Sequence, residues 1–386
     1  MFGRMMRNYY YGKSGQGDFR KDDMPETRMQ LFWDTLRTRL SAICRLSMMY
    51  FIVWIPAVVV ILLNFSNLWS QIQMEAAISS YSYTEYVEIL QKNGQELKVS
   101  EEDYNLLRAN LLERDRIAKD ANYDAYVERV KENGGEALTQ EQFNLVRTNY
   151  VSDLENRIFH LLLLLFPCIA ITGPFTAGIS YVTRNWARDE HAFIWTDFKD
   201  AVKANWKIPL LLSIITGALP LLVYQAWITY GKMASQNMIM VVPQMLVLLV
   251  GILWSLCITY MHPLTITYDL KVKDVFRNGI LLGIARLPMS VGIRLLHCVP
   301  ALIAFVAVWF FGLDPMMGLV LLAGYYMLIG FGLSRFVTAS YTNAVFDRFI
   351  NSRIEGAKTN QGLRPKEEFD DEDDADEEPK QEETGK

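Results

Sequence analysis

Cysteine and histidine, the residues that most often bind metals or carry redox chemistry, are scarce in this sequence. Each occurs four times among 386 residues, without a CxxC pair and without two ligands at the spacing of a zinc site. The cysteines fall in or beside apolar runs, where a thiol serves as a small buried hydrophobic group; they are Cys44, Cys168, Cys257 and Cys298. We therefore expect no metal site, no cofactor and no redox function.

The motifs of common enzyme classes are also missing. The sequence contains no HExxH, no Ser-His-Asp signature and no nucleotide-binding fingerprint. The letters GKS at 12–14 resemble the end of a P-loop, but the first glycine of that motif would stand at Arg7. No apolar strand precedes this stretch to aim backbone amides at a phosphate. We expect a protein that is not an enzyme.

Long apolar runs, such as MMYFIVWIPAVVVILL from position 48, are the dominant feature that is present. A helix of about 20 residues crosses ~30 Å of hydrocarbon, so these runs predict membrane spans. The fold class expected is all-α: a polytopic membrane protein with spans at about 46–65, 158–180, 208–230, 238–260, 293–312 and 316–337. Residues 1–45 are too long and too charged for a cleaved signal peptide, so we expect the first span to remain as an anchor.

Lysine and arginine are distributed unevenly between the two sides of these spans. They are concentrated before the first span and in the loops after the second and fourth, whereas the links at 231–237 and 312–315 hold only Lys232. Because positive residues stay in the cytoplasm, we expect both termini to be cytoplasmic in a bacterial cell membrane.

A pattern of a helical lead-in followed by two spans recurs three times. It covers the first span and the membrane part at 158–345. Helical lead-ins at 29–40, 195–207 and 273–288 precede the odd spans, the first being amphipathic and lying on or entering the inner leaflet. The odd spans each hold one proline: Pro56, Pro220 and Pro300. The even spans each end at a hydroxyl–tyrosine pair: Ser180–Tyr181, Thr267–Tyr268 and Ser340–Tyr341. This predicts three helical hairpins; the shared composition of membrane sequences is the alternative explanation.

Residues 66–157 interrupt the first hairpin and contain a clearer repeat. The stretch YTEYVEILQKNGQELKVSEEDYNLLRAN at 83–110 returns as YDAYVERVKENGGEALTQEQFNLVRTN at 123–149. An Asn-Gly pair ends the first helix of each copy, and Ser100 or Thr139 opens the second. We expect an extracytoplasmic insert of two helical hairpins, with its Tyr and Leu positions forming hairpin core rather than a ligand site.

Polar residues gather where span five begins. The four residues are Arg286, Ser290, Arg294 and His297. If one continuous helix carries them, they lie within about 80° of arc on its surface, with Gly279 and Gly283 on the same side. Charges at this depth are costly and face protein, water or headgroups. They indicate an anion or polar-substrate path, or else an interfacial helix with snorkelling arginines that packs through Gly-x-x-x-Gly, which is the simpler interpretation.

Two segments are expected to form a cytoplasmic docking surface rather than a catalytic site. In the loop after span two, the residues are Arg184, Arg188, Trp195 and Asp197, in a salt-bridged setting. In the N-terminal arm they are Tyr11, Gly12, Lys13, Gly15, Gly17 and Asp18. The C-terminal segment 346–386 ends in an acidic run that is expected to be a disordered cytoplasmic tail.

Two stretches resemble the YesL-type family of uncharacterised bacterial membrane proteins. They are YYYGKSGQGDFRKDDMPETRMQLFWDTLRTRL at 9–40 and GPFTAGISYVTRNWARDEHAFIWTDFKDAVKANWK at 173–207. The resemblance covers roughly 1–63 and 158–345, while the insert and the acidic tail depart from the shorter family pattern. It implies a multi-span helical protein, often associated with carbohydrate uptake systems, with no assigned activity or catalytic residues.

These observations lead to two functional hypotheses. The first is a non-enzymatic accessory component of a carbohydrate transport system, with an ABC-type sugar permease complex as its partner. The alternative is an autonomous small-molecule transporter or channel with a polar path near Arg286, Arg294 and His297. The lipid bilayer is the expected surrounding in both cases, a homo-oligomer is compatible with both, and a nucleic-acid partner is not expected.

Overall fold

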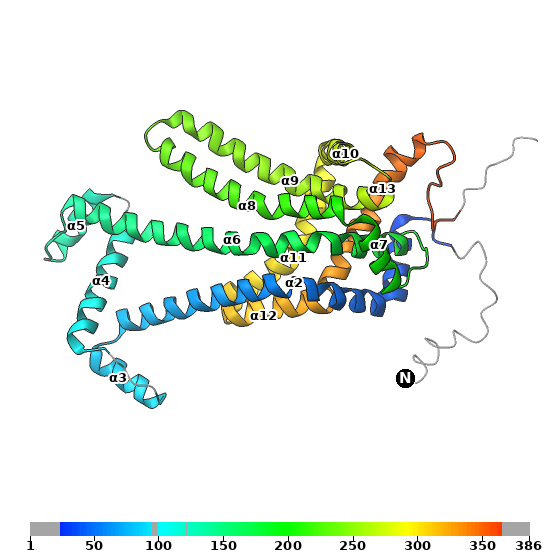
Figure 1. Ribbon diagram of the computed structural model, residues 1–386. Coiled ribbons are helices and arrows are strands. Elements are labelled where there is room, and N and C mark those ends of the chain that lie inside the picture. The colour runs from blue at the N-terminus through cyan, green and yellow to red at the C-terminus, as the bar shows by residue number, and fades with distance from the viewer. Residues whose placement is uncertain (1–23, 95–98, 121, 365–386) are drawn as a thin grey trace, which may run out of the picture.

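The computed structural model describes residues 24–94, 99–120 and 122–364, which fold into helices and connecting segments without a strand. Figure 1 shows an elongated bundle, with small helices projecting at one end and the two ends of the described chain at the other, where Arg364 donates to the carbonyl oxygen of Pro25. The arm residues 11–18 proposed for docking, and residues 365–386 of the predicted tail, lie outside the described residues. The predicted start of the disordered tail at 346 is wrong, because α13 runs on to Phe349, a short helix η4 (Asn351–Arg353) follows, and Phe346 and Asn351 are buried.

Within the described ranges, six helical segments are long and apolar enough to cross a membrane, which indicates a multi-pass helical membrane protein. They are α2 (Arg28–Ser80), α6 (Gln140–Trp186), α8 (Lys207–Ala234), η2 with α9 (Met238–Met240, Val241–Thr267), α11 (Leu287–Phe311), and α12 with a π-helical turn η3 and α13 (Pro315–Tyr325, Tyr326–Gly330, Phe331–Phe349). Each predicted span corresponds to one of them. The helices extend beyond the apolar runs because backbone hydrogen bonding does not stop where the side chains become polar.

Two of the three lead-ins are separate helices. These are α7 (Thr196–Asn205) and α10 (Val272–Ala285), which break from the following spans at Trp206 and at Arg286. The lead-in before the first span is also set off from it, by a kink rather than by a gap. It begins at a capping box of Thr27 and Gln30, and Arg39, with non-helical φ of −109° and ψ of 15°, joins it to the rest of α2.

The hydroxyl–tyrosine pairs mark a helix end only once. Helix α9 ends at Thr267, and Tyr268 is its extended C-cap. By contrast, α6 continues past Tyr181 to Trp186, and α13 continues past Tyr341 to Phe349. A serine–tyrosine pair carries no stop signal of its own, and the residues after it are buried in the bundle, where an unbroken helix satisfies the backbone.

The insert contains α3 (Tyr83–Lys92), α4 (Glu101–Lys119), α5 (Tyr123–Glu132) and the first turns of α6. Both predicted Asn-Gly stops are confirmed, since Gly94 and Gly134 have φ of 69° and 70°, the left-handed conformation that ends a helix. Both predicted starts are confirmed as well. Ser100 and Thr139 accept hydrogen bonds from backbone N–H groups three residues on.

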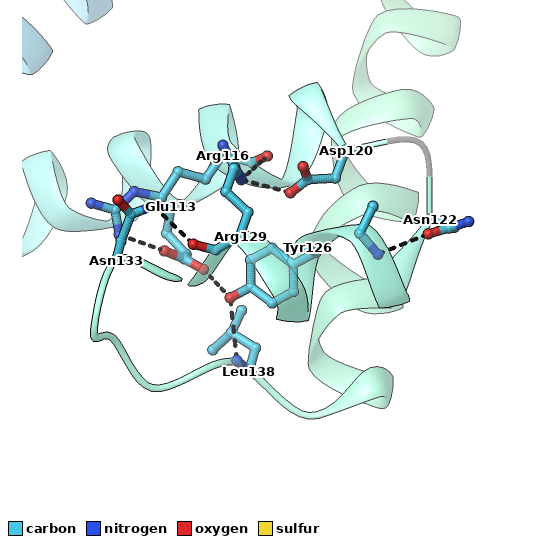
Figure 2. A network of polar contacts seen from close by, with 9 residues as sticks. Glu113, Arg116, Asp120, Asn122, Tyr126, Arg129, Asn133 and Leu138 are labelled. Atoms are coloured by element: carbon cyan, nitrogen blue, oxygen red, sulfur yellow. Dashed lines mark hydrogen bonds and ion pairs between the residues drawn. The ribbon is translucent and has the colours of Figure 1, made fainter. Parts of the chain in front are cut away.

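The core of the insert is aromatic. Tyr104, Tyr126 and Phe143 are fully buried, as predicted, whereas Leu106 and Leu145 at matching positions are 62% and 60% exposed. The prediction is therefore wrong for these two leucines, which lie two residues after a buried ring and point away from it. Leu111 is buried, however, and Leu138 packs against the second cluster. Figure 2 shows the polar contacts around Tyr126, whose hydroxyl donates to Glu113.

In the membrane part, helices approach closely at small residues. A Cβ on Gly173 would lie 2.4 Å from the carbonyl oxygen of Pro209 in α8, and one on Gly332 would lie 2.5 Å from that of Ile43 in α2. Gly279 and Gly283 likewise place α10 against α9, next to Cys257. The Gly-x-x-x-Gly pair thus packs helices, as predicted, and the thiol of Cys257 is buried in this contact.

Candidate functional site: a polar cavity inside the bundle

A cavity of about 600 Å³ lies between the spanning helices α2, α6, α8, α9, α11 and α13. Its volume is within the ~300–1,000 Å³ of sites for small molecules. One part of the wall is apolar and includes Trp54, Leu219 and Ile258. The other part is strongly polar and holds four nitrogen-bearing side chains: His262, Arg294, His297 and Arg335.

Two of these side chains are oriented by backbone carbonyls. The Nε of Arg294 donates to the carbonyl oxygen of Ser255 in α9, at 2.5 Å. His297, one turn further along α11, has its Nε2 3.1 Å from the carbonyl oxygen of Ser334 in α13. Because a carbonyl only accepts, Nε2 of His297 carries a proton in this arrangement. The terminal nitrogens of Arg294 are then left to serve other partners.

Four polar atoms in the wall are buried without a partner among the described residues: Nε1 of Trp54, Nδ1 of His262, Nδ1 of His297 and the hydroxyl oxygen of Thr259. His262 itself is only 5% exposed. Buried polar groups are almost always hydrogen-bonded in folded proteins, and each one left unpaired costs ~1–3 kcal/mol. A wall with four such atoms is suited to a solute that supplies the missing partners.

The cavity has a positive wall without a compensating carboxylate. Its described lining includes no aspartate or glutamate. Neither Arg294 nor Arg335 forms an ion pair with any residue in the described ranges. A charged side chain at this depth of a membrane costs ~2.5–3.5 kcal/mol or more, and such residues usually mark substrate or ion pathways.

Hydroxyl groups complete the polar wall. They belong to Thr172, Thr176, Ser213, Thr216, Ser255, Thr259, Ser334 and Thr338. Some are tied to neighbouring aromatic residues: Tyr50 contacts Thr176 at 2.7 Å, and the indole of Trp254 donates to Thr216 at 3.1 Å. These bonds hold the wall in place and connect α2 with α6 and α8 with α9.

The structure brings together two of the four residues predicted for a polar path. Arg294 and His297 line the cavity, whereas Arg286 and Ser290 do not. The helix breaks at Arg286, with φ of −116° and ψ of 32°, so its side chain leaves the predicted arc and stacks over Phe349. Ser290 is buried against Tyr260, oxygen to oxygen at 2.6 Å. The assumption of one continuous helix through these positions is wrong.

The docking residues predicted in the loop after α6 do not form one surface either. Arg184 is turned inward, donating to the carbonyl oxygen of Ile266 at 2.7 Å. Asp197, in the first turn of α7, accepts from the backbone N–H of Phe193 in the preceding link. Trp195 is 65% exposed, and Arg188 is half-buried. The salt-bridged setting is not found at these four positions; a neighbouring ion pair joins Asp189 to Arg39 instead.

Two residues of the site, His262 and Arg335, are missing from the sequence-based prediction. Arg335 stands inside predicted span six, and an ionisable residue within a span is by itself a reason to expect a site. His262 lies two residues past the predicted end of span four, at 260, and was therefore not recognised as a residue within the membrane. In the structure α9 continues to Thr267 and carries His262 into the bundle.

Comparison with known proteins gives one match. Residues 154–227 fit a family model described as "Protein of unknown function, DUF624". This region includes the membrane part of α6, all of α7 and most of α8, and hence the cavity hydroxyls of Thr172, Thr176, Ser213 and Thr216. No curated protein matches the chain, and no solved structure does. The match connects one side of the cavity to this family without assigning it an activity.

Proposed function

We propose that this protein is a non-enzymatic membrane transporter that carries a small polar solute through the cavity between its spanning helices. The observation that carries this proposal is the polar wall at membrane depth, where arginines and buried polar atoms without partners among the described residues lie next to an apolar side. Sites for small molecules combine an apolar lining with a few convergent polar groups. This is the autonomous alternative of the two hypotheses from the sequence.

The proposal includes an orientation. We place both termini in the cytoplasm of a bacterial cell, three helical hairpins in its membrane and the insert outside, in a YesL-type protein. The distribution of lysine and arginine supports this orientation, and the family match to 154–227 supports the YesL-type assignment. His262 lies between one and two turns before the end of α9, so the polar wall would face the cytoplasmic half of the membrane.

Cysteine labelling tests the proposal without knowledge of the solute. In a variant whose four native cysteines are replaced by alanine, Ser334→Cys puts one thiol in the cavity wall. A charged, membrane-impermeant thiol reagent should label it from either side, because a transporter opens its site to each side in turn. The matched control is Leu302→Cys on the lipid-facing surface of α11, which should stay unlabelled. Labelling from one side only would contradict transport, and no labelling would contradict a water-accessible site.

A specific observation also supports the accessory role. Phe193 and Trp195, in the link before α7, are 66% and 65% exposed, and α7 lies at the end of the bundle away from α3, α4 and α5 (Figure 1). Large exposed aromatic side chains are typical of protein-binding surfaces. The corresponding proposal is an accessory component of a carbohydrate transport system, bound to an ABC-type permease complex through these rings.

Replacement of both rings separates the two candidates. If the accessory role holds, Phe193→Ala with Trp195→Ala should release a co-purifying permease and leave the labelling of Ser334→Cys unchanged. The control is Trp33→Ala, an exposed aromatic residue on α2. A wild-type protein that purifies from its own membrane without a permease would rule out the accessory role.

A further inference from the structure

We infer that the solute of this cavity is a small anion with a carboxylate or phosphate group, bound by Arg294 and Arg335. The inference rests on the proposed function and narrows it from a polar solute to a charged one. It comes from the sign of the charges around the cavity and from the kind of atoms left without partners.

The two arginines reinforce each other's positive potential. Arg335 lies close enough to Arg294 and to His262 to act on both electrostatically, and no carboxylate of the described chain is among the groups that act on either. Two like charges inside a bundle repel each other strongly because the surroundings screen them little. An anion between them removes this repulsion and gains two attractive contacts, whereas a neutral solute leaves it in place.

Arg294 is held in a geometry suited to binding an anion. Its Nε is occupied by the carbonyl oxygen of Ser255, which fixes the plane of the guanidinium group. The two terminal nitrogens remain as a planar fork, and carboxylate and phosphate groups fit such a fork through two parallel hydrogen bonds. Arg335 has no hydrogen bond or ion pair to a described residue, so its whole fork is available.

The partnerless atoms complete the site. The imidazole of His262, buried to 5% exposure, and the hydroxyl of Thr259 lie on adjacent turns of α9, and both line the cavity together with Arg294. A hydroxyl can donate to an oxyanion, and so can an imidazole nitrogen that carries a proton. The apolar remainder of the wall, with Trp54 and Ile258, leaves room for an organic body attached to the anionic group.

The test compares solutes that differ in charge. The full chain is placed in nanodiscs of zwitterionic phosphatidylcholine, and its unfolding temperature is measured by tryptophan fluorescence at constant ionic strength in sodium chloride. Glycerol 3-phosphate and glycerate should each raise the unfolding temperature by at least ~2 °C, and glycerol should not. The three probes share a carbon skeleton, so a difference between them reports the anionic group.

Variants connect this shift to the cavity. Arg335→Gln should abolish the shift, and Arg335→Lys, which keeps the charge without the planar fork, should retain part of it. The matched control is Arg277→Gln on the exposed face of α10, which should leave the shift intact. Labelling of Ser334→Cys in the Arg335→Gln background shows whether that variant keeps its fold and its cavity.

A second arm distinguishes a free solute from a lipid headgroup. Nanodiscs of anionic phosphatidylglycerol offer the same glycerol phosphate group on a lipid. If they stabilise the wild type but not Arg335→Gln, and free anions add no further shift, the anion is a headgroup and the charge inference stands. The inference would be overturned if glycerol stabilised the protein as much as the anions do, or if Arg335→Gln kept the anion-induced shift. Either result would still be compatible with a cavity that binds a solute. The absence of any shift in both membranes would overturn it too. The proposed function would fall as well only if Ser334→Cys were unlabelled or labelled from one side alone.

Discussion

Arginine side chains have different partners in the insert and in the cavity. In the insert, Arg114 bonds to Glu75 at 2.7 Å and Arg129 to Asp120 at 2.6 Å. The pKa of Arg114 is raised, chiefly by its hydrogen bond to Glu75. In the cavity, Arg294 donates instead to a backbone carbonyl, which carries no full charge. Paired charges stabilise a surface, whereas charges at depth without an ionic partner are a cost that a ligand can offset.

The hydroxyl of Tyr126 is a buried link that can be removed cleanly. It donates to Glu113 and accepts from the backbone N–H of Leu138 at 3.2 Å (Figure 2). Tyr126→Phe keeps the ring and leaves both partners unpaired, so we expect a local loss of ~1–2 kcal/mol. Hydrogen exchange of the α5 amides should then become about 5–30 times faster.

The matched control for this change is Tyr86→Phe. Tyr86 has the corresponding position in the first copy of the repeat and stacks on Tyr104, and its hydroxyl forms no hydrogen bond to a described residue. Unchanged exchange in Tyr126→Phe would contradict the structural role of the Tyr126 hydroxyl.

The burial of Tyr126 also makes the stability of the insert depend on pH. Burial, and then the hydrogen bond to Glu113, raise the pKa of Tyr126 above the ~10 of a free tyrosine. A raised folded-state pKa means that the stabilisation is fully present below pH ~10 and is lost as the pH rises through the folded-state value. Protection of the α5 amides, corrected for intrinsic exchange, should therefore fall more steeply above pH ~10 in the wild type than in Tyr126→Phe. If the protection of wild type and Tyr126→Phe fell equally with pH, the pKa of Tyr126 would not be raised by folding.

At the scale of elements, the spans and the helix stops and starts of the insert could be predicted, whereas the exact break between α10 and α11 could not. A run such as 48–63 is apolar over its whole length, and its hydrophobicity alone fixes a helix in a membrane. The break at Arg286 has no such signal, because the residue before a leucine–proline pair can adopt several backbone conformations. This break explains why Arg286 leaves the predicted arc, whereas Ser290 shares α11 with Arg294 and His297 and is taken up by its contact with Tyr260.

Close helix contacts provide a prediction at the same scale. Gly332 in α13 faces the backbone of Ile43 in α2, and an added Cβ would lie 2.5 Å from a carbonyl oxygen, closer than any relaxed contact. Gly332→Ala should therefore force the helices apart and lower the unfolding temperature by several degrees. Gly292→Ala is the matched control, since a Cβ there meets no described atom within 4 Å and alanine is the better helix former. Thermal unfolding in detergent separates the two, and an equally stable Gly332→Ala would show that α2 and α13 are not in contact.

At the scale of the whole molecule, the cavity belongs to all of the spans rather than to one segment. Its wall combines hydroxyls from α6 and α8 with basic side chains from α9, α11 and α13. The sequence could show each residue as costly in a membrane, but not which ones meet, because their distances along the chain carry no information about helix packing. Arg294 and Arg335 lie in consecutive spans, and only the antiparallel return through α12 and η3 places both at the same depth.

The insert and the membrane part share two continuous helices, α2 and α6, but each has its own core. The buried clusters of the insert contain Ile78, Tyr104 and Phe143, while those of the membrane part contain Tyr50, Met261 and Phe346. The separation follows from the amphipathic pattern of the insert helices, which bury one aromatic face against each other. The membrane part should therefore fold without the insert.

A deletion tests this independence. Gln71 in α2 accepts a hydrogen bond from Arg157 in α6 at 2.7 Å, so the chain ends at 71 and 157 are adjacent and a short Gly-Ser linker can replace 72–156. The deletion also removes Glu155 and with it the partly exposed ion pair to Lys232, which contributes only ~0–1 kcal/mol. The shortened protein should unfold within a few degrees of the full chain and keep the labelling of Ser334→Cys.

A second substitution makes this test quantitative. Gly332→Ala should lower the unfolding temperature of the shortened and the full chain by the same amount, because the effects of changes at distant sites add. A shortened chain that aggregates, or that responds differently to Gly332→Ala, would show that the insert supports the packing of α2 on α13. The insert would then be part of the membrane fold, and the two separate cores would not correspond to two independent folding units.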